Sequence, residues 1–192
     1  MDLLSLNEVQ ERLLEQYEML DGEIPELNMN DSSIEQWQLD ALSEDLGSSL
    51  PREFSESLLK YDFGELNVGG IFFGQTGDYI DFLKQSNLGS EPSCWWGNGE
   101  RPSSVIMIGG TDGYVLLLDC SNGEIDAFRR GEDYTSKKLI AANFELLVRG
   151  AGTVHFGRKK ADDKASFGNN VSSLCNAENE ITFWSELAQG IT

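Results

Sequence analysis

The sequence predicts an α+β fold in which an antiparallel or mixed central sheet is flanked by helices. Over the first third of the chain, apolar residues recur at three- and four-residue steps, which is typical of amphipathic helices. After Gly64 the pattern changes to short apolar runs separated by glycines, which favours strands. Helical spacing returns at residues 136–149. This order differs from the alternation of strands and helices that produces a parallel, doubly wound sheet.

Two of the expected helices have recognisable starts. The first covers residues 5–20, because Ser5 and Glu8 have the spacing of a capping box. Another begins at Pro51, since a proline in the first turn lacks only an N–H group that the helix does not use. Its apolar face continues to Gly64, where the helix is expected to end.

A further helix is expected between these two, over residues 33–46. Ser32 and Glu35 have capping-box spacing at its start, and Gly47 follows its last turn. One face of this helix is apolar and is expected to pack against the rest of the protein. That face consists of Ile34, Trp37, Ala41 and Leu42.

The glycine-rich middle of the chain predicts four strands. They are expected near residues 70–74, 104–109, 114–119 and 124–128. The last two are joined by Cys120-Ser121-Asn122-Gly123, whose Asn-Gly pair supplies the positive backbone angles that a tight hairpin turn needs. Residues 109–113 lack the Gly-Lys-Ser/Thr ending of a phosphate-binding loop and precede no helix. They are therefore interpreted as a turn between strands.

The segment between the first two expected strands contains a short helix, residues 78–88, and a loop, residues 89–103. The loop carries two adjacent tryptophans, Trp95 and Trp96. Either one ring packs and the other covers it, or one is exposed as an anchor of the kind that dominates binding at protein interfaces. After Gly150 the chain is expected to form a polar stretch with one weak helix, residues 180–188.

Acidic residues strongly outnumber basic ones. The chain has 33 Asp and Glu against 14 Lys and Arg, a formal net charge of −19, and residues 1–65 alone contain 17 acidic and 3 basic residues. Nucleic-acid binding depends on cations that displace counterions from phosphates, so no nucleic-acid partner is expected. The acidic helices are either a solvated surface or a docking face for a basic protein.

No catalytic, metal or cofactor site is expected. Cys94, Cys120 and Cys175 contain no Cys-x-x-Cys pair and suggest a reducing cytoplasm, and the one histidine, His155, has no second histidine as a partner. The amino terminus lacks a signal-peptide pattern, and no run of about 18 apolar residues could span a membrane. A hydrolase that uses two of the many carboxylates is the enzymatic alternative.

Several motifs occur in a fixed order between residues 34 and 150. One helix ends at Glu44-Asp45-Leu46-Gly47, and the next begins at Leu50-Pro51-Arg52-Glu53-Phe54. The later motifs are Ile108-Gly109-Gly110-Thr111-Asp112-Gly113-Tyr114, Leu117-Leu118-Asp119, Gly123-Glu124-Ile125 and Ala141-Ala142-Asn143-Phe144-Glu145-Leu146-Leu147. Their order and spacing resemble the SUKH superfamily, which includes the yeast Knr/Smi cell-wall assembly regulators. The chain departs from that pattern at Asp62-Phe63, at Trp95-Trp96 and after Gly150.

The resemblance implies a SUKH-like α+β core at residues 31–150 within a single domain, residues 1–192. Residues 1–30 would be an N-terminal helical extension and residues 151–192 a C-terminal extension. It also implies no catalytic activity and no cofactor. For bacterial members it implies an immunity protein, as in toxin–antitoxin pairs, that neutralises a polymorphic toxin, often a nuclease or deaminase. A regulatory or scaffold module of the cell-wall assembly regulator type is the alternative.

The resemblance and the charge together predict a cytoplasmic protein that binds one basic toxin. The partner-binding residues are expected on loops and helix ends near the sheet. The candidates are Glu44, Asp45, Asp78, Tyr79, Asp81, Trp95, Trp96 and Asp112. No membrane partner is expected, and the sequence leaves the oligomeric state open.

Overall fold

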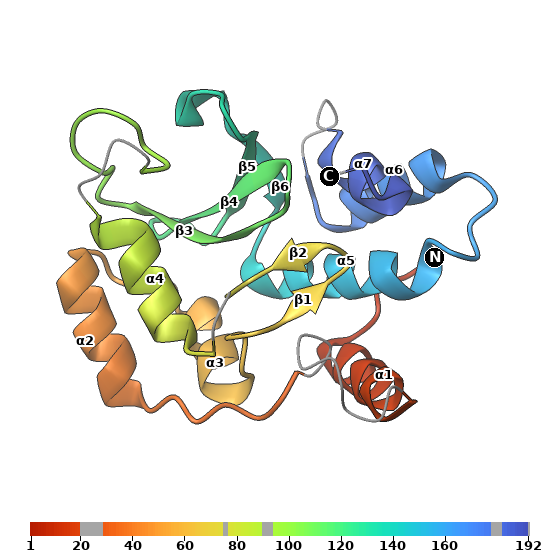
Figure 1. Ribbon diagram of the computed structural model, residues 1–192, viewed down its shortest axis with the longest axis horizontal. Helices are drawn as coiled ribbons and strands as arrows, with labels where there is room; N and C mark the ends of the chain where they lie inside the picture. The colour runs from red at the N-terminus through yellow and green to blue at the C-terminus, as the bar shows by residue number, and fades with distance from the viewer. Residues whose placement is uncertain (20–28, 75–76, 90–93, 178–181, 192) are drawn as a thin grey trace.

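A six-stranded antiparallel sheet forms the centre of the protein in the computed structural model (Figure 1). The structure describes residues 1–19, 29–74, 77–89, 94–177 and 182–191. The strands follow one another across the sheet in chain order. They are β1 (Asn67–Val68), β2 (Ile71–Phe72), β3 (Val105–Gly110), β4 (Tyr114–Asp119), β5 (Ile125–Arg129) and β6 (Lys138–Ala141). The fold is therefore α+β, as expected, and all of its strand pairs are antiparallel.

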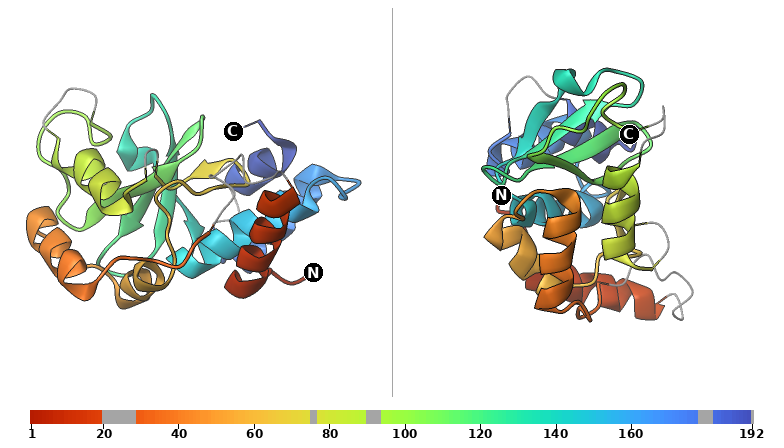
Figure 2. Two further views of the ribbon diagram at one scale, coloured as in Figure 1. Left: turned by 60° about the horizontal axis from the view of Figure 1, so that its bottom comes forward. Right: turned by 90° about the vertical axis from the view of Figure 1, so that its left-hand side faces the viewer.

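Helices surround this sheet on several sides (Figures 1 and 2). Their bounds are α1 (Leu6–Met19), α2 (Gln36–Leu46), α3 (Arg52–Lys60), α4 (Tyr79–Leu88), α5 (Phe144–Gly157), α6 (Lys164–Leu174) and α7 (Phe183–Gln189). Helix α5 passes behind β1 and β2 in Figure 1 and packs against α1, α3 and α6. Helices α2 and α4 lie side by side at the opposite end of the molecule from α6 and α7.

The two faces of the sheet pack against different parts of the protein. On the inner face, Ile106, Leu116 and Ala127 belong to the main core together with Phe144 and Leu147 of α5. The outward-pointing side chains are also apolar and form a second cluster. That cluster contains Val105, Val115, Leu117 and Phe128, with Trp95, Met107 and Tyr134 packed against it. The outer face is therefore covered by Trp95 from the segment after α4 and by Tyr134 from a short 3₁₀ turn.

The start of the second helix differs from the prediction. Helix α2 begins at Gln36, and its capping box is formed by Glu35 and Gln38 rather than by Ser32 and Glu35. The buried face of α2 also differs from the predicted one. Leu39, Leu42 and Leu46 are buried, whereas Trp37, expected on the apolar face, is 64% exposed.

The predicted helix at residues 136–149 is wrong in its first half. Residues 138–141 form β6, and Leu139 pairs with Asp126 of β5. Helix α5 begins only at Phe144, because Asn143 caps it by accepting a hydrogen bond from the N–H of Leu146 at 2.9 Å. A short apolar run such as Leu139-Ile140 has no period of its own, and pairing with β5 determined its conformation.

The strand predicted at residues 70–74 corresponds to β2, which is one of the two strands of a smaller hairpin. Strands β1 and β2 have two residues each, and Gly69 and Gly70 between them have φ angles of 69° and 101°. The Asn122–Gly123 hairpin is confirmed, but Gly123 alone supplies a positive φ, of 83°. Asn122 instead accepts a hydrogen bond from the N–H of Glu124 at 2.9 Å.

Both ends of the chain contribute to the main core. The first helix has the predicted Ser5–Glu8 capping box and buries Val9 and Leu13. The chain after Gly150 is not a polar stretch, because α5 continues to Gly157 and α6 and α7 pack on each other. The expected helix at residues 180–188 is confirmed as α7 in its described part; residues 180 and 181 lie outside the described residues. Buried side chains of α1, α6 and α7 belong to the same core as the sheet.

Candidate functional site

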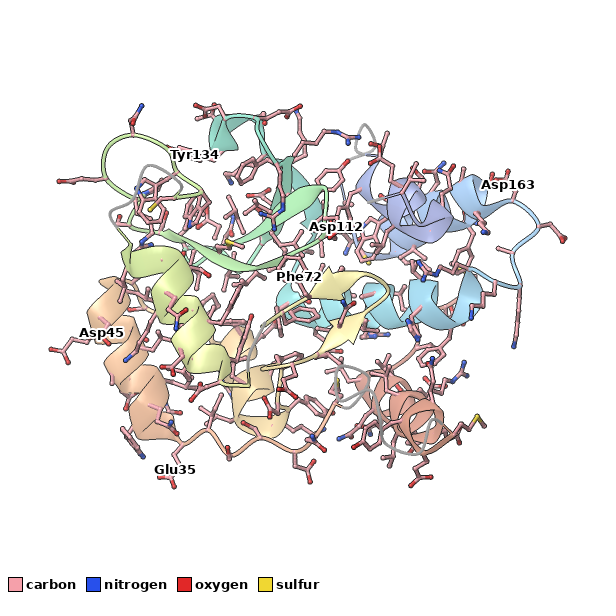
Figure 3. All side chains as sticks on the ribbon, in the orientation of Figure 1. Glu35, Asp45, Phe72, Asp112, Tyr134 and Asp163 are labelled. Atoms are coloured by element: carbon pink, nitrogen blue, oxygen red, sulfur yellow. The ribbon has the colours of Figure 1, made fainter. Side chains whose placement is uncertain are left out.

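The eight candidate binding residues lie in three separate places. On and beside the packed helices α2 and α4 lie Glu44, Asp45, Asp78 and Asp81, together with the buried Tyr79. Trp95 and Trp96 lie in the loop after α4, and Asp112 lies in the β3–β4 turn. In Figure 3, Asp45 on α2 and Asp112 in the β3–β4 turn are well separated. The structure therefore brings together the acidic candidates of α2 and α4 but not Asp112.

The first of these places is an acidic surface on α2 and α4, which face the viewer together in the right view of Figure 2. We call it the α2–α4 acidic face. It consists of the exposed residues Glu35, Asp40, Glu44, Asp45, Asp78 and Asp81. Lys84 is the one basic residue within these two helices. Its ammonium nitrogen lies 2.8 Å from Asp45 Oδ2, and this hydrogen bond raises the pKa of Lys84.

Two neighbouring candidates at the start of α4 have structural roles. Asp78 caps the helix by accepting hydrogen bonds from the N–H groups of Ile80 at 2.8 Å and Asp81 at 3.3 Å. Tyr79 is buried, its hydroxyl donates to the carbonyl of Ile108 at 2.7 Å, and burial raises its pKa. Asp78 remains exposed, but a partner could not reach Tyr79, which corrects its expected role.

Trp37 is the residue of this face that sequence reasoning missed. It is 64% exposed, and its indole N–H donates to Glu35 Oε2 at 2.9 Å. A large exposed aromatic among carboxylates is the type of residue that anchors protein interfaces. The signal was present in the sequence, because the Leu39, Leu42 and Leu46 spacing defines a buried face that excludes position 37.

The tryptophan pair is packed rather than presented to solvent. Trp96 is buried, and Trp95 is half-buried with its ring edge-on to Trp96 at a centroid distance of 5.4 Å. On its other side, Trp95 makes an edge-on contact with Tyr134 at 5.6 Å. The packing therefore follows the first alternative, in which one ring packs and the other covers it. A role of the half-buried Trp95 in partner binding stays a prediction. Trp96 is too deeply buried to contact a partner directly.

Trp95 and Tyr134 are two walls of a cavity of about 670 Å³ on the outer face of the sheet. Met107, Val115 and Phe128 line it from β3, β4 and β5. We call this cavity the outer-face pocket. The last turn of α4 also contributes to its lining, so the pocket adjoins the helix that carries part of the α2–α4 acidic face.

A buried amide fixes one wall of the outer-face pocket. Asn87 is 2% exposed, and its Nδ2 donates to the carbonyls of Leu83 at 2.8 Å and Met107 at 2.9 Å. Its Oδ1 accepts from the N–H of Met107 at 2.7 Å and from the indole N–H of Trp95 at 3.1 Å. Asn87 thus uses both its donors and its acceptor to join α4, β3 and Trp95.

His155 and Cys175 make contacts within the fold. His155 Nδ1 accepts from the N–H of Gly69 at 3.3 Å, and its Nε2 lies 2.8 Å from Gln16 Oε1. Burial, and secondly the charge of Arg158, lower the pKa of His155 to about 4, so the ring is neutral and bridges three segments. Burial raises the pKa of Cys175 to about 12. Within the described residues, no group of three His, Cys, Asp or Glu side chains could hold a metal ion.

The site is thus a solvent-exposed acidic face beside a partly apolar pocket on an antiparallel sheet, which suits a module that binds other proteins. The chain belongs to the SMI1/KNR4 family (SUKH-1), whose model matches residues 33–150. The matched region contains all six strands and ends within α5, so α1, α6 and α7 lie outside it. No curated protein matches the chain. Family membership supports a toxin-immunity or Knr4/Smi1-type role in general.

The described helices also bear on the expectation about membranes. None of the helices within the described ranges combines the length and the apolar character needed to cross a bilayer.

Proposed function

We propose that this protein is a non-enzymatic immunity protein that binds and neutralises a cognate toxin with a basic surface, a nuclease or deaminase domain. The observation that carries the proposal is the α2–α4 acidic face, where six exposed carboxylates are offset within the two helices by Lys84 alone. A nuclease needs cations where it holds the phosphates of its substrate. An acidic protein can occupy that surface in place of nucleic acid.

The proposed contacts are refined by the burial of the candidates. Glu44, Asp45 and Asp81 would pair with lysines and arginines of the toxin, and Asp78 would add charge beside them. Trp37 would supply apolar contact area within the same face. Tyr79 and Trp96 are buried and would act only by holding their surroundings in place. Asp112 lies apart and would contact only a toxin that extends to the β3–β4 turn.

Neutralisation of this kind requires no bond to be made or broken. The inhibitor covers the substrate groove, and its effect depends on affinity and on the speed of encounter. Opposite net charges raise the association rate, and salt lowers it, because mobile ions screen exposed charges over about 8 Å at physiological ionic strength. The proposal therefore includes a salt-sensitive association between two oppositely charged proteins in the cytoplasm.

The first test is affinity capture of the tagged protein from its native host at low and high salt, followed by mass spectrometry. We expect one basic partner, retained in near-equal amount, that is toxic when expressed alone. Many weak, salt-labile partners would instead support the regulatory or scaffold alternative. A single acidic or non-toxic partner would contradict the immunity proposal.

Charge reversal locates the interface. Glu44→Lys combined with Asp81→Lys replaces two carboxylates that are not needed as helix caps. An ion pair at 4 Å in water contributes about 1 kcal/mol, so loss of two pairs alone predicts roughly 30-fold weaker binding at low salt, and the repulsion introduced by the two lysines weakens it further. The matched control is Glu11→Lys with Glu15→Lys, which changes the net charge equally on exposed positions of α1. Equal weakening by both pairs would show that net charge alone, and not the α2–α4 acidic face, matters.

A further inference from the structure

One aromatic ring of the protein is left open to solvent. The structure describes every Phe, Tyr and Trp of the chain, and Trp37 alone among them is exposed, at 64%. It packs against neither of the two apolar clusters of the described residues. An exposed Trp forgoes the burial that its large ring would gain in a core. The ring of Trp37 is therefore free to contact another molecule.

This ring is nevertheless held in place on its helix. The indole N–H of Trp37 donates to Glu35 Oε2 at 2.9 Å, and Glu35 is the N-cap of α2. In Figure 3, Glu35 lies at the lower left of the molecule, at the start of α2. The faces of an aromatic ring carry partial negative charge. Trp37 thus presents an electron-rich face beside a carboxylate that is already bonded to its N–H group.

Further carboxylates follow on the same side of α2. Asp40 and Glu44 come three and seven residues after Trp37, a spacing that places all three on one side of a helix, and both are exposed. Neither forms an ion pair within the part of the chain that the structure describes. Helix α2 itself contains no Lys or Arg. Its outward side therefore combines a ring face with negative charge.

Elsewhere in the same protein, such a combination holds an arginine. On β4, Tyr114 donates its hydroxyl to Glu186 Oε2 at 2.9 Å, which is also the length of the indole–carboxylate hydrogen bond on α2. The guanidinium carbon of Arg129 lies 4.9 Å from the centre of the Tyr114 ring, and its Nη2 donates to Glu186 Oε1. An aromatic ring whose polar hydrogen donates to a carboxylate thus binds a guanidinium in this fold.

The group on α2 has the ring and the carboxylate without the cation. Four aromatic rings carry a Lys or Arg of the same chain over their faces, and Trp37 is not one of them among the described residues. A carboxylate can accept several hydrogen bonds, so the bond from the indole leaves Glu35 able to accept more. The group formed by Trp37 and Glu35 is therefore open to a cation from another molecule.

The geometry of this group favours arginine over lysine. The planar guanidinium can stack on an aromatic face while its N–H groups, which lie in its own plane, reach a carboxylate beside the ring. The lysine ammonium is a compact, strongly hydrated charge that cannot stack in this way. Trp is the best aromatic partner for a cation, and Arg is the more frequent cation.

We infer that an arginine side chain of the toxin stacks on Trp37 and donates hydrogen bonds to Glu35, with Asp40 adding negative charge beside it. This inference rests on the proposed function, since the arginine belongs to the basic partner of the α2–α4 acidic face. It makes this end of the face selective for arginine, beyond a general attraction for positive charge.

Two basic peptides of equal charge test the inference without the toxin. The probes are acetyl-Arg-Gly-Arg-Gly-Arg-Gly-Arg-amide and the same peptide with lysine in place of arginine. Calorimetry at low salt gives the two dissociation constants. The place of binding is followed in ¹H–¹⁵N spectra through the indole N–H of Trp37, assigned with Trp37→Tyr. The indole of Trp184, bonded to the carbonyl of Ile140 in the core, is the internal reference.

We expect the wild type to bind the arginine peptide about two- to fivefold more tightly than the lysine peptide, which is the factor of a cation–π contact at an exposed site. The arginine peptide should shift the Trp37 indole signal saturably, while the Trp184 signal stays unchanged. Equal affinities for the two peptides, or an unshifted Trp37 signal, would overturn the inference.

Substitutions at Trp37 and Glu35 separate stacking from other contacts. Trp37→Tyr keeps an aromatic ring and should retain a preference for arginine, whereas Trp37→Leu keeps apolar area without a ring and should bind both peptides equally. Glu35→Gln should weaken binding of the arginine peptide more than Glu53→Gln, which removes the same charge from an exposed position in the first turn of α3. A preference that persists in Trp37→Leu, or equal effects of the two glutamine variants, would contradict the site.

The peptide experiment also separates this inference from the proposed function. If the two peptides bind equally while Glu44→Lys with Asp81→Lys still weakens toxin binding, the arginine site is rejected and the proposed function stands. If the peptides show the preference but capture from the host yields no basic toxin, the proposed function is rejected and the arginine site stands.

Discussion

Removal of the Asn87 amide tests whether the buried network organises the outer face of the sheet. Asn87→Ala removes four hydrogen bonds, which involve Leu83, Met107 and Trp95. Each such bond contributes about 1 kcal/mol net, so complete loss would cost about 4 kcal/mol. Because the outer-face pocket lies beside Trp95, water can replace part of the network. We therefore expect a loss of about 3 kcal/mol in the free energy of unfolding.

Urea unfolding with an unchanged slope measures this loss, and the Trp95 indole resonance reports on the wall itself. Asn87→Asp is the isosteric comparison: its carboxylate would face the carbonyls of Leu83 and Met107 and should be at least as destabilising. Asn169→Ala, at an exposed position of α6, should change stability by less than about 0.5 kcal/mol. A loss below about 1 kcal/mol for Asn87→Ala, with an unmoved Trp95 signal, would refute the assigned role.

Three further predictions concern stability. Gly168→Ala should lower the free energy of unfolding in urea by about 1–3 kcal/mol, because the added Cβ would overlap the Trp184 carbonyl and Ser185 Cα. Alanine favours helices more than glycine does, so a stabilised variant would contradict this packing. The pKa of His155 is about 4 in the folded protein and 6.5 in the unfolded chain, so the unfolded state binds the proton more readily as the pH falls. Between pH 7 and pH 4 the wild type should therefore lose about 3 kcal/mol more free energy of unfolding than His155→Gln. Parallel plots of unfolding free energy against pH for the two proteins would contradict this prediction. Asn143→Ala should lower stability by about 1 kcal/mol through loss of the α5 cap, and an unchanged melting temperature would argue against the cap.

Local signals in the sequence were sufficient for much of the fold. The Ser5–Glu8 capping box and the turn at Gly123 are determined by residues within a few positions of each other, and both are present. The resemblance to SUKH proteins, drawn from motifs between residues 34 and 150, is confirmed by the family match over 33–150. The order of helices, sheet and helix also held in outline.

Features that depend on distant contacts were not predictable in the same way. Leu139 belongs to a strand because β5 lies beside it. The chain after Gly150 is structured because Gly150 and Gly168 allow the close approach of Trp184 and its neighbours. The acidic candidates of α2 and α4 were chosen from charge and position, and the structure places them at the surface of two neighbouring helices. The contact between Trp95 and Tyr134 was not predicted, because no local sequence pattern shows that these two residues meet on the outer face of the sheet.

The most direct test of the central claim is growth rescue with the captured partner. Host cells that express the basic partner would carry the wild-type protein, the Glu44→Lys and Asp81→Lys variant, or the Glu11→Lys and Glu15→Lys control at equal folded levels. We expect growth with the wild type and the control and loss of growth with the α2–α4 variant. Equal rescue by all three proteins would contradict neutralisation through the α2–α4 acidic face.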